Sequence, residues 1–261
     1  MDLIEAPRGL SDPHVRHPWE TARFEVVKRL IARHVQIQEG AVVVDIGCGD
    51  AFVVGTLAAM FPAAEFYGVD SGLTPEAIGL VERRLSLRNL HLCQHLDALT
   101  PKPRRPAALV LLMDVLEHVE DDEAFLKDLL ARDVVDPQTC VLITVPAYAW
   151  LISAHDVFLR HFRRYTNRTL RQRLEHAGLR VIEGSYFFLS LLPLRMLQVL
   201  KERLFGRPAT TATDLMTARG RASAALLTRA LVADARVGLG LTRVGITVPG
   251  LSTYAICRKS A

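Results

Sequence analysis

Hydrophobic residues recur with two different periods along the chain. Residues Pro18–His34 carry apolar side chains at helical spacing, including Phe24, Val27, Leu30 and Ile31, which predicts an opening helix. Short, almost continuously apolar runs then alternate with helical stretches. The runs span residues 41–47, 65–70, 90–94, 108–113 and 140–145, and the helical stretches span 52–60, 74–87 and 121–131. Strands of this kind are buried on both faces of a parallel sheet, so the alternation predicts a doubly wound α/β fold.

The pattern changes after residue 146. It predicts a helix over residues 169–177, a strand over 181–188 and a final strand over 253–258. The long stretch between these two strands is helical in character. We therefore expect a mostly parallel, seven-stranded sheet with a helical insertion before the last strand.

The insertion holds two amphipathic segments, residues 187–205 and 222–244. The first has a broad apolar face above a narrow polar stripe, which consists of Arg195, Gln198, Lys201 and Glu202. The second repeats the pattern with arginines two helical turns apart, which are Arg229, Arg236 and Arg243. Either both helices bury their apolar faces against each other or a second copy of the chain, or they form a lipophilic substrate pocket or touch a membrane surface. The first segment is too short and too interrupted to predict a transmembrane helix.

On this basis the chain is one domain with four parts. Residues 1–40 form an N-terminal helical cap, 41–188 a cofactor-binding core, 189–251 the helical insertion or substrate lid, and 252–261 the final strand. A chain of 261 residues, 50% of them hydrophobic, can build such a core without covalent cross-links.

Cysteine usage points to a reducing compartment. The cysteines lie far apart and form no C-x-x-C pair; they are Cys48, Cys93, Cys140 and Cys257. This spacing argues against a zinc site or a disulfide framework. The first residues show no secretion signal, so we expect a cytoplasmic protein, or one peripheral to the inner membrane.

The net charge of +4 is modest, but basic residues gather in one short stretch. They are Arg160, Arg163, Arg164, Arg168, Arg171 and Arg173. The cluster is either a solvated helix face or a patch for an anionic partner such as a phosphate-bearing substrate, a lipid surface or RNA.

Candidate chemistry begins with the run VVVDIGCGDAF, residues 42–52. It predicts a buried strand that stops at an acidic residue and two glycines, and then a helix. Such a unit brings backbone N–H groups and a helix N-terminus to a bound ligand. The spacing of Gly47, Gly49 and Ala51 departs from the dinucleotide fingerprint, because no third glycine follows at the required offset.

Later strand ends add further polar residues. YGVDSG ends the second strand at Asp70, whose carboxylate can accept hydrogen bonds from both hydroxyls of a ribose. HLDAL offers Asp97 for the edge of an adenine, and the fourth strand leads into MDVLEHVEDD. Together with the glycine loop, these features resemble the class I S-adenosylmethionine-dependent methyltransferases over residues 42–145 at least.

The resemblance implies S-adenosylmethionine as the cofactor. The residues that it assigns to the cofactor pocket are Asp45, Gly47, Cys48, Gly49, Asp70, Ser71, Asp97, Ala98, Met113 and Asp114. By this carry-over the glycines line the methionine part, Asp70 binds the ribose, Asp97 meets the adenine and Asp114 lies beside the sulfonium. Ala51 stands where many members have a third glycine, and we expect its extra methyl group to leave binding intact.

The acceptor is less constrained by the sequence. DVLEHVEDDEAFLKDL resembles the small-molecule branch that contains ubiquinone-pathway O-methyltransferases and uncharacterised bacterial relatives. The chain has MDVL where amino-methylating DNA enzymes have an Asn/Asp-Pro-Pro-aromatic motif, and it lacks the Pro-Cys dipeptide of cytosine C5 enzymes. These differences argue against DNA. A hydroxyl on a small lipophilic or aromatic substrate, carrier- or lipid-linked in some cases, is the simplest acceptor.

A hydroxyl acceptor benefits from a nearby base, and histidine suits this task because its pKa lies near neutrality. The candidates, in order of preference, are His155, His118 and His161. His155 follows the fifth strand and His118 the fourth. His161 shares a helix face with Arg164 if residues 157–165 are helical.

A metal is the alternative to a histidine base. Asp114, Glu117 and His118 lie at i, i+3 and i+4, which would bring them together on a helix, and hard oxygen donors suit Mg²⁺. Against this, the Glu-His pair is common in relatives not known to use metals, and Glu117 can simply cap or pair nearby. We therefore expect no metal, and unchanged turnover in excess EDTA would agree.

The sequence thus predicts an S-adenosylmethionine-dependent methyltransferase acting on a small, lipophilic acceptor, most simply at oxygen. One alternative is RNA or protein methylation, in which the run HFRRY would stack bases. Another is a non-catalytic cofactor-binding scaffold that partners a biosynthetic enzyme through its apolar helices.

Overall fold

The centre of the molecule is a seven-stranded sheet with the strand order β3-β2-β1-β4-β5-β7-β6. The computed structural model describes residues 16–206 and 221–260. Its strands are β1 (Val42–Ile46), β2 (Glu65–Val69), β3 (Leu90–Cys93), β4 (Leu109–Met113), β5 (Cys140–Pro146), β6 (Leu179–Phe187) and β7 (Ser252–Lys259). The first five run parallel, and β7 is antiparallel to both β5 and β6. The predicted α/β class and mostly parallel sheet are confirmed.

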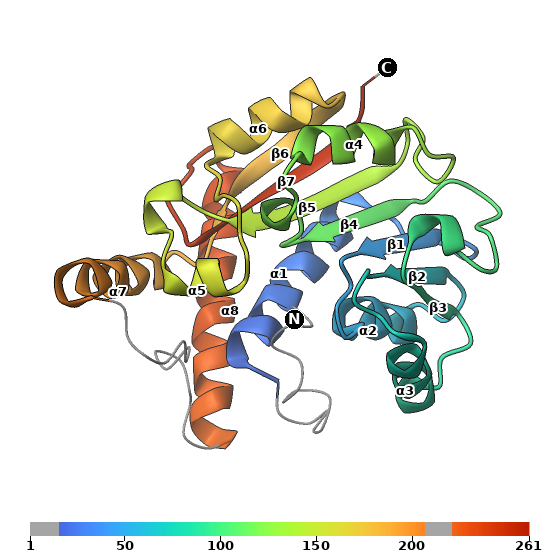
Figure 1. Ribbon diagram of the computed structural model, residues 1–261, viewed down its shortest axis with the longest axis horizontal. Coiled ribbons are helices and arrows are strands. Elements are labelled where there is room, and N and C mark those ends of the chain that lie inside the picture. Colours follow the sequence, from blue (N-terminus) through green and yellow to red (C-terminus); the bar gives the residue numbers. More distant parts are fainter. Residues whose placement is uncertain (1–15, 207–220, 261) are drawn as a thin grey trace.

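Helices cover both faces of this sheet (Figure 1). They are α1 (Pro18–His34), α2 (Phe52–Met60), α3 (Pro75–Leu85), α4 (Asp122–Leu130), α5 (Ala154–Phe158), α6 (Asn167–His176), α7 (Leu191–Phe205) and α8 (Arg221–Arg243). One hydrophobic core joins the sheet to α1, α2, α3 and α8, and a second joins its other face to α4 and α6. Strands buried between two helical layers explain why their sequences are apolar at almost every position.

The sequence signals of the helix ends are observed in α3. The Thr74 side chain accepts a hydrogen bond from the backbone N–H of Ala77, and Pro75 is the first helical residue. A side-chain cap satisfies one of the otherwise unpaired N–H groups of the first turn, and proline loses nothing there because it has no N–H.

In the part of the chain that the structure describes, three short 3-10 helices lie in the loops at the carboxyl ends of the strands. They are η2 (Leu96–Ala98), η3 (Leu116–His118) and η4 (Ala149–Leu151). The carboxyl ends of β1 to β5 meet at one edge of the sheet, so the loops after them converge on the same side. Open parallel sheets bind their ligands at this edge.

The predicted insertion lies between β6 and β7, and its two helices differ. Helix α8 packs along α1 and against β6, and it buries Leu231, Ala235 and Leu239. Helix α7 is set apart from the sheet (Figure 1) and buries only Leu191 and Val199. Among the described residues, α8 thus buries apolar side chains against α1 and β6 of its own chain, and not against α7 as the sequence pattern allowed, while α7 leaves most of its apolar face exposed.

The polar stripe of α7 faces the rest of the protein, an orientation that the sequence pattern does not indicate. Arg195, Gln198 and Glu202 contact the protein, while Lys201 is exposed. The outer face carries exposed apolar residues, namely Leu194, Met196, Leu197, Leu200, Leu204 and Phe205. Within the described ranges, no helix is both long enough and apolar enough to cross a membrane.

Candidate cofactor and acceptor site

The loop between β1 and α2 is shaped by left-handed backbone conformations. Gly47 has φ +74° and Gly49 has φ +55°. A Cβ atom on Gly47 would lie 2.5 Å from Cγ2 of Val115, so the loop has no room for a side chain there. Ala51 adopts φ +60°, a conformation that costs alanine about 1 kcal/mol or more relative to glycine. Glycine adopts this conformation most readily, which gives a backbone reason for the glycine that the family resemblance leads one to expect at position 51.

Asp70, at the end of β2, holds the glycine loop in place. Its Oδ2 accepts a hydrogen bond from the Gly49 N–H at 2.8 Å, and its Oδ1 accepts one from the Gly72 N–H at 2.8 Å. The carboxylate is half-buried and Ser71 beside it is exposed. Each carboxylate oxygen has a second lone pair, so Asp70 can still accept from a ribose hydroxyl.

Asp45 is a buried carboxyl group that a bound cation could neutralise. It lies inside β1, is fully buried, and neither side-chain oxygen accepts a hydrogen bond from residues 16–206 or 221–260. Burial raises its pKa to about 7, although the nearby Arg23 opposes this shift. Burying an unpaired carboxylate is costly. The ammonium of a bound methionine moiety would supply the missing partner, so the residues of this loop fit the predicted cofactor.

This environment predicts a pH dependence. Below about pH 7 the Asp45 carboxyl is neutral and cannot attract an ammonium group, whereas above it the group is ionised. Affinity for S-adenosylhomocysteine should therefore rise by up to about tenfold per pH unit towards pH 7 and then level off. Calorimetric titrations with S-adenosylhomocysteine at several pH values measure this change in affinity. The raised pKa also affects stability. Because the pKa of Asp45 is higher in the folded protein than in the unfolded chain, the protonated group stabilises the ligand-free folded state at pH values below its unfolded pKa. This stabilisation is lost as the pH rises through about 7.

The matched variant for that test is Asp45→Asn, which keeps the shape of the side chain and cannot ionise. We expect its affinity to be low and independent of pH over the same range. An equally steep pH profile in this variant would remove Asp45 from cofactor binding.

The end of β4 presents Met113 and Asp114. Met113 is buried, and Asp114 has φ +54°. The Asp114 carboxylate pairs with the Arg23 guanidinium of α1, and its Oδ1 accepts a hydrogen bond from the Thr144 hydroxyl at 3.1 Å. The Arg23 guanidinium also lies over the Trp19 ring, 4.4 Å from its centre. Arg23 was not predicted, since nothing in its sequence context links α1 to the end of β4.

The predicted adenine contacts lie at the surface. Asp97 is part of η2, its side chain is 82% exposed, and its carboxylate pairs with Arg132 at 2.5 Å. Ala98 is also exposed. A carboxylate already held by arginine can share its second oxygen with an adenine amino group, so the assignment of Asp97 stays a prediction.

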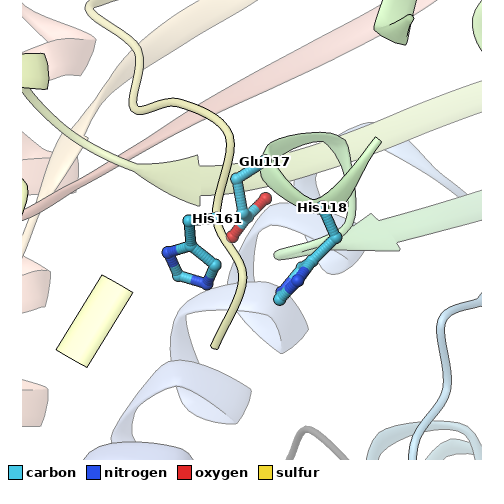
Figure 2. A group of neighbouring side chains, drawn as sticks. All are labelled: Glu117, His118 and His161. Atoms are coloured by element: carbon cyan, nitrogen blue, oxygen red, sulfur yellow. The ribbon is translucent and has the colours of Figure 1, made fainter. Parts of the chain in front are cut away.

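Glu117, His118 and His161 form a cluster at the carboxyl end of β4, which we call the Glu117 cluster. Their ligand atoms all lie within 4.8 Å of one another. The rings of the two histidines meet edge to face with centres 4.5 Å apart, and the Glu117 carboxylate lies next to this pair (Figure 2). Glu117 is fully buried, and within the described part of the chain neither of its oxygens is hydrogen-bonded; burial raises its pKa well above the ordinary range. The structure thus brings together two of the three candidate histidines.

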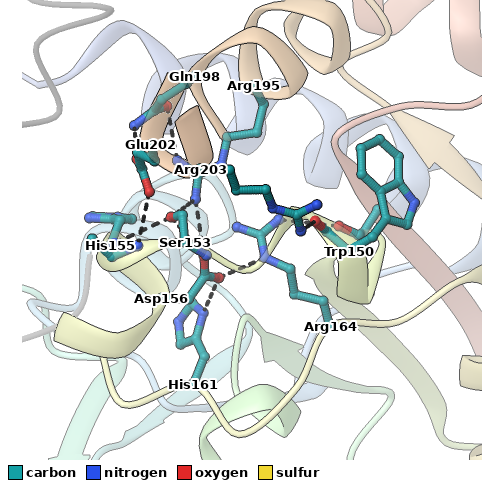
Figure 3. A network of polar contacts seen from close by, with 12 residues as sticks. Trp150, Ser153, His155, Asp156, His161, Arg164, Arg195, Gln198, Glu202 and Arg203 are labelled. Carbon is teal, nitrogen blue, oxygen red and sulfur yellow. Dashed lines mark hydrogen bonds and ion pairs between the residues drawn. The ribbon is translucent and has the colours of Figure 1, made fainter. Parts of the chain in front are cut away.

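Asp156 is the centre of a polar network that joins the loop after β5 to α7 (Figure 3). Its carboxylate accepts hydrogen bonds from His161 Nδ1 at 3.0 Å, Arg164 Nε at 2.6 Å and Arg195 Nη2 at 3.0 Å. Burial alone would raise the pKa of this carboxyl, but the bond from His161 and the charges of the two arginines hold it well below its ordinary value. The network fixes α7, through Arg195, to the same side chain that orients His161.

His155, the preferred candidate base, lies apart from the Glu117 cluster. It belongs to α5, on the side of the Asp156 network that faces Glu202 of α7 (Figure 3). Burial, reinforced by Arg195, lowers its pKa, so its ring is neutral near pH 7. Residues 157–165 are not one helix, because α5 ends at Phe158, so the condition under which His161 would share a helix face with Arg164 is not met.

Most of the arginine cluster is engaged by carboxylates of the same chain. Arg164 pairs with Asp156, and Arg163 pairs with the buried Asp122. The remaining two pairs are Arg171 with Glu175, and Arg173 with Glu123. The cluster therefore serves the fold at these positions and offers less to an anionic partner than its sequence indicates.

Comparison with known proteins identifies the family. The profile described as "Methyltransferase domain" matches residues 19–184, which is more than half of the chain. The chain belongs to the methyltransferase domain family. The matched region runs from α1 into β6 and includes the glycine loop, Asp70 and the Glu117 cluster, so this enzyme is a methyltransferase. No curated protein matches the chain.

Solved structures share the fold at low identity. A chain in the complex between the Haloferax volcanii Trm112 methyltransferase activator and a methyltransferase is 16% identical, with a TM-score of 0.56 over 93% of this chain and 91% of that one. Coclaurine N-methyltransferase bound to N-methylheliamine and SAH is 15% identical, with a TM-score of 0.53 over 90% and 70%. The [4+2]-cyclase SpnF is 16% identical, with a TM-score of 0.53 over 91% and 81%. Such identities establish the fold and leave the acceptor open.

Proposed function

We propose that this methyltransferase moves the methyl group of S-adenosylmethionine to a hydroxyl oxygen of a small, lipophilic acceptor. The observation that carries the choice of donor is the buried Asp45 carboxyl, which accepts no hydrogen bond from the described residues, beneath a glycine loop whose Gly47 has no space for a side chain. Coclaurine N-methyltransferase, which has the same fold, binds SAH. These features support a methionine moiety at the carboxyl end of β1, with its ribose at Asp70.

The Glu117 cluster supports oxygen as the methylated atom. In the proposed reaction the acceptor oxygen attacks the methyl carbon, the S–CH₃ bond breaks, and its electron pair stays on sulfur as the neutral thioether. The hydroxyl proton must leave, and groups that favour the ionised oxygen lower the barrier. Glu117 and His118 lie just beyond Asp114 on the loop after β4, and His161 reaches them from the loop after α5, so the cluster would lie next to the expected position of the sulfonium. We place the acceptor hydroxyl there.

The surface around α7 supports a lipophilic acceptor. Leu197 and Leu200 are about half exposed. Trp150, in η4, is 47% exposed, and its backbone carbonyl accepts a hydrogen bond from Arg203 of α7. The Tyr148 ring stacks on Tyr186 at 5.3 Å and approaches the Trp150 ring at 5.7 Å. An apolar helix and stacked aromatic rings can hold an acyl, polyene or aromatic skeleton. The same face would suit contact with a lipid surface, from which such an acceptor could be taken.

Methyl transfer to an extract of the host's lipids and small molecules tests this proposal. With methyl-labelled S-adenosylmethionine, we expect the label in an organic-phase product, and we expect it to resist mild alkaline hydrolysis because an ether does so and an ester does not. The Asp70→Ala variant, with its loop no longer held, should transfer far less label. Label in RNA or protein, or in no fraction, would contradict the proposal.

A further inference from the structure

We propose that the Glu117 cluster binds one divalent transition-metal ion through Glu117, His118 and His161. The inference rests on the proposed function for its role, because the ion would lie where the acceptor hydroxyl is placed. The ligand atoms come from η3 and from the loop after α5, and all lie within 4.8 Å of one another. Ligands of a single ion with bonds of about 2.1 Å stand roughly 3 to 3.5 Å apart, so small side-chain rotations complete the set.

Glu117 is the strongest argument for a cation. The side chain is fully buried, and neither oxygen accepts a hydrogen bond from the described residues. Its carboxylate lies beside both imidazole rings (Figure 2). A buried carboxylate in such a place is expensive unless it is paired or coordinates a metal. The two arginines whose charges favour its ionised form, Arg23 and Arg164, are already paired with Asp114 and Asp156.

The orientation of His161 is the second argument. Its Nδ1 lies 3.0 Å from Oδ1 of Asp156, and an Nδ1–H donated to a carboxylate leaves Nε2 as the lone-pair nitrogen. A ligand histidine that donates its other N–H to a carboxylate is the usual arrangement around protein-bound metals, since the carboxylate fixes the tautomer and makes the ring a better donor. Asp156 is itself held by Arg164 and Arg195, so the ring is firmly positioned.

The donor set indicates the class of metal. Two imidazoles and one carboxylate suit zinc or iron(II) better than magnesium, which prefers oxygen ligands. This set also differs from the one that the sequence spacing suggested, because Asp114 is engaged by Arg23 and Thr144 while His161 comes from a distant part of the chain. Three protein ligands leave positions open for the acceptor oxygen, whose hydroxyl proton would pass to solvent as the ion lowers its pKa.

Cobalt(II) titration of the full-length protein after chelator treatment tests the site without any turnover, because cobalt replaces zinc and absorbs visibly when coordinated. We expect one cobalt ion per chain, displaced by zinc. Glu117→Gln, His118→Ala and His161→Ala should each lose the signal, with thermal unfolding showing that they remain folded. His176→Ala is the matched control, since His176 is exposed on α6 and far along the chain from the cluster; its titration should equal that of the wild type.

Two results would overturn the metal site. One is a wild-type protein that binds no cobalt or zinc, and the other is binding that all three cluster variants retain. If either result is obtained and methyl transfer to the lipid extract still proceeds in excess chelator, the proposed function stands and the metal site is rejected. Conversely, cluster-dependent cobalt binding with no methyl transfer would leave the metal site standing and reject the proposed function.

Discussion

Replacing Asp156 by alanine is expected to destabilise the protein by about 3–5 kcal/mol, the range for removing one partner of a buried charge network. The Asp156 side chain is 1% exposed, and the guanidinium groups of Arg164 and Arg195 lie against it with side chains only 6% and 10% exposed. Without the carboxylate, two buried cations face each other uncompensated, and the Ser153 backbone N–H loses its acceptor. The free energy of unfolding from a denaturant titration measures the loss.

Asp128→Ala is the matched control for Asp156→Ala. Its carboxylate also pairs with an arginine, Arg132, at 2.9 Å, but the Asp128 side chain is 65% exposed. Exposed pairs contribute about 0–1 kcal/mol. Equal losses in the two variants would mean that the Asp156 network adds no more than a surface ion pair, and that α7 is held by other contacts.

The second large effect is expected from Gly47→Ala, in affinity for the cofactor. Gly47 has φ +74°, and an added Cβ would lie 2.5 Å from Val115 Cγ2, so both the backbone and the packing oppose a side chain. Left-handed strain in a non-glycine residue costs about 1–3 kcal/mol. If this cost distorts the loop that receives the methionine part, affinity falls roughly 10- to 100-fold. Calorimetric titration with S-adenosylhomocysteine measures the change.

Gly79→Ala provides the comparison for Gly47→Ala. Gly79 lies within α3, where a Cβ would approach only the mobile Arg83 guanidinium, at 3.3 Å. Alanine in a helix interior is favoured over glycine by about 1 kcal/mol, so this variant should bind as the wild type does and be slightly more stable. If Gly47→Ala binds as tightly as Gly79→Ala, the loop between β1 and α2 does not shape the cofactor site.

The sheet and the loop were predictable because their signals are local. A run such as ALVLLM, which becomes β4, is apolar at every position because both faces of that strand are buried. The glycines of the β1–α2 loop and the cap at Thr74 likewise report backbone conformations that neighbouring residues impose. Asp70 was found for the same reason, since it follows β2 directly.

The rest of the site depends on contacts between distant segments. No spacing rule links Glu117 to His161, or Asp114 to Arg23, because the chain path between η3, the loop after α5 and α1 is set by tertiary packing. The orientation of α7 was missed for a related reason. An amphipathic pattern shows that a helix has two faces, but here the buried Asp156 attracts the polar one through Arg195.

Hydrogen–deuterium exchange of the wild-type protein with and without S-adenosylhomocysteine tests the cofactor site most directly. Binding should slow exchange at the amides of the β1–α2 loop and of the loop after β2, where Gly47, Gly49 and Gly72 lie. Slowed exchange in these loops is the predicted result. Unchanged exchange there, or slowing confined to α7 and α8 while the ligand demonstrably binds, would contradict the placement of S-adenosylmethionine at the carboxyl ends of β1 and β2.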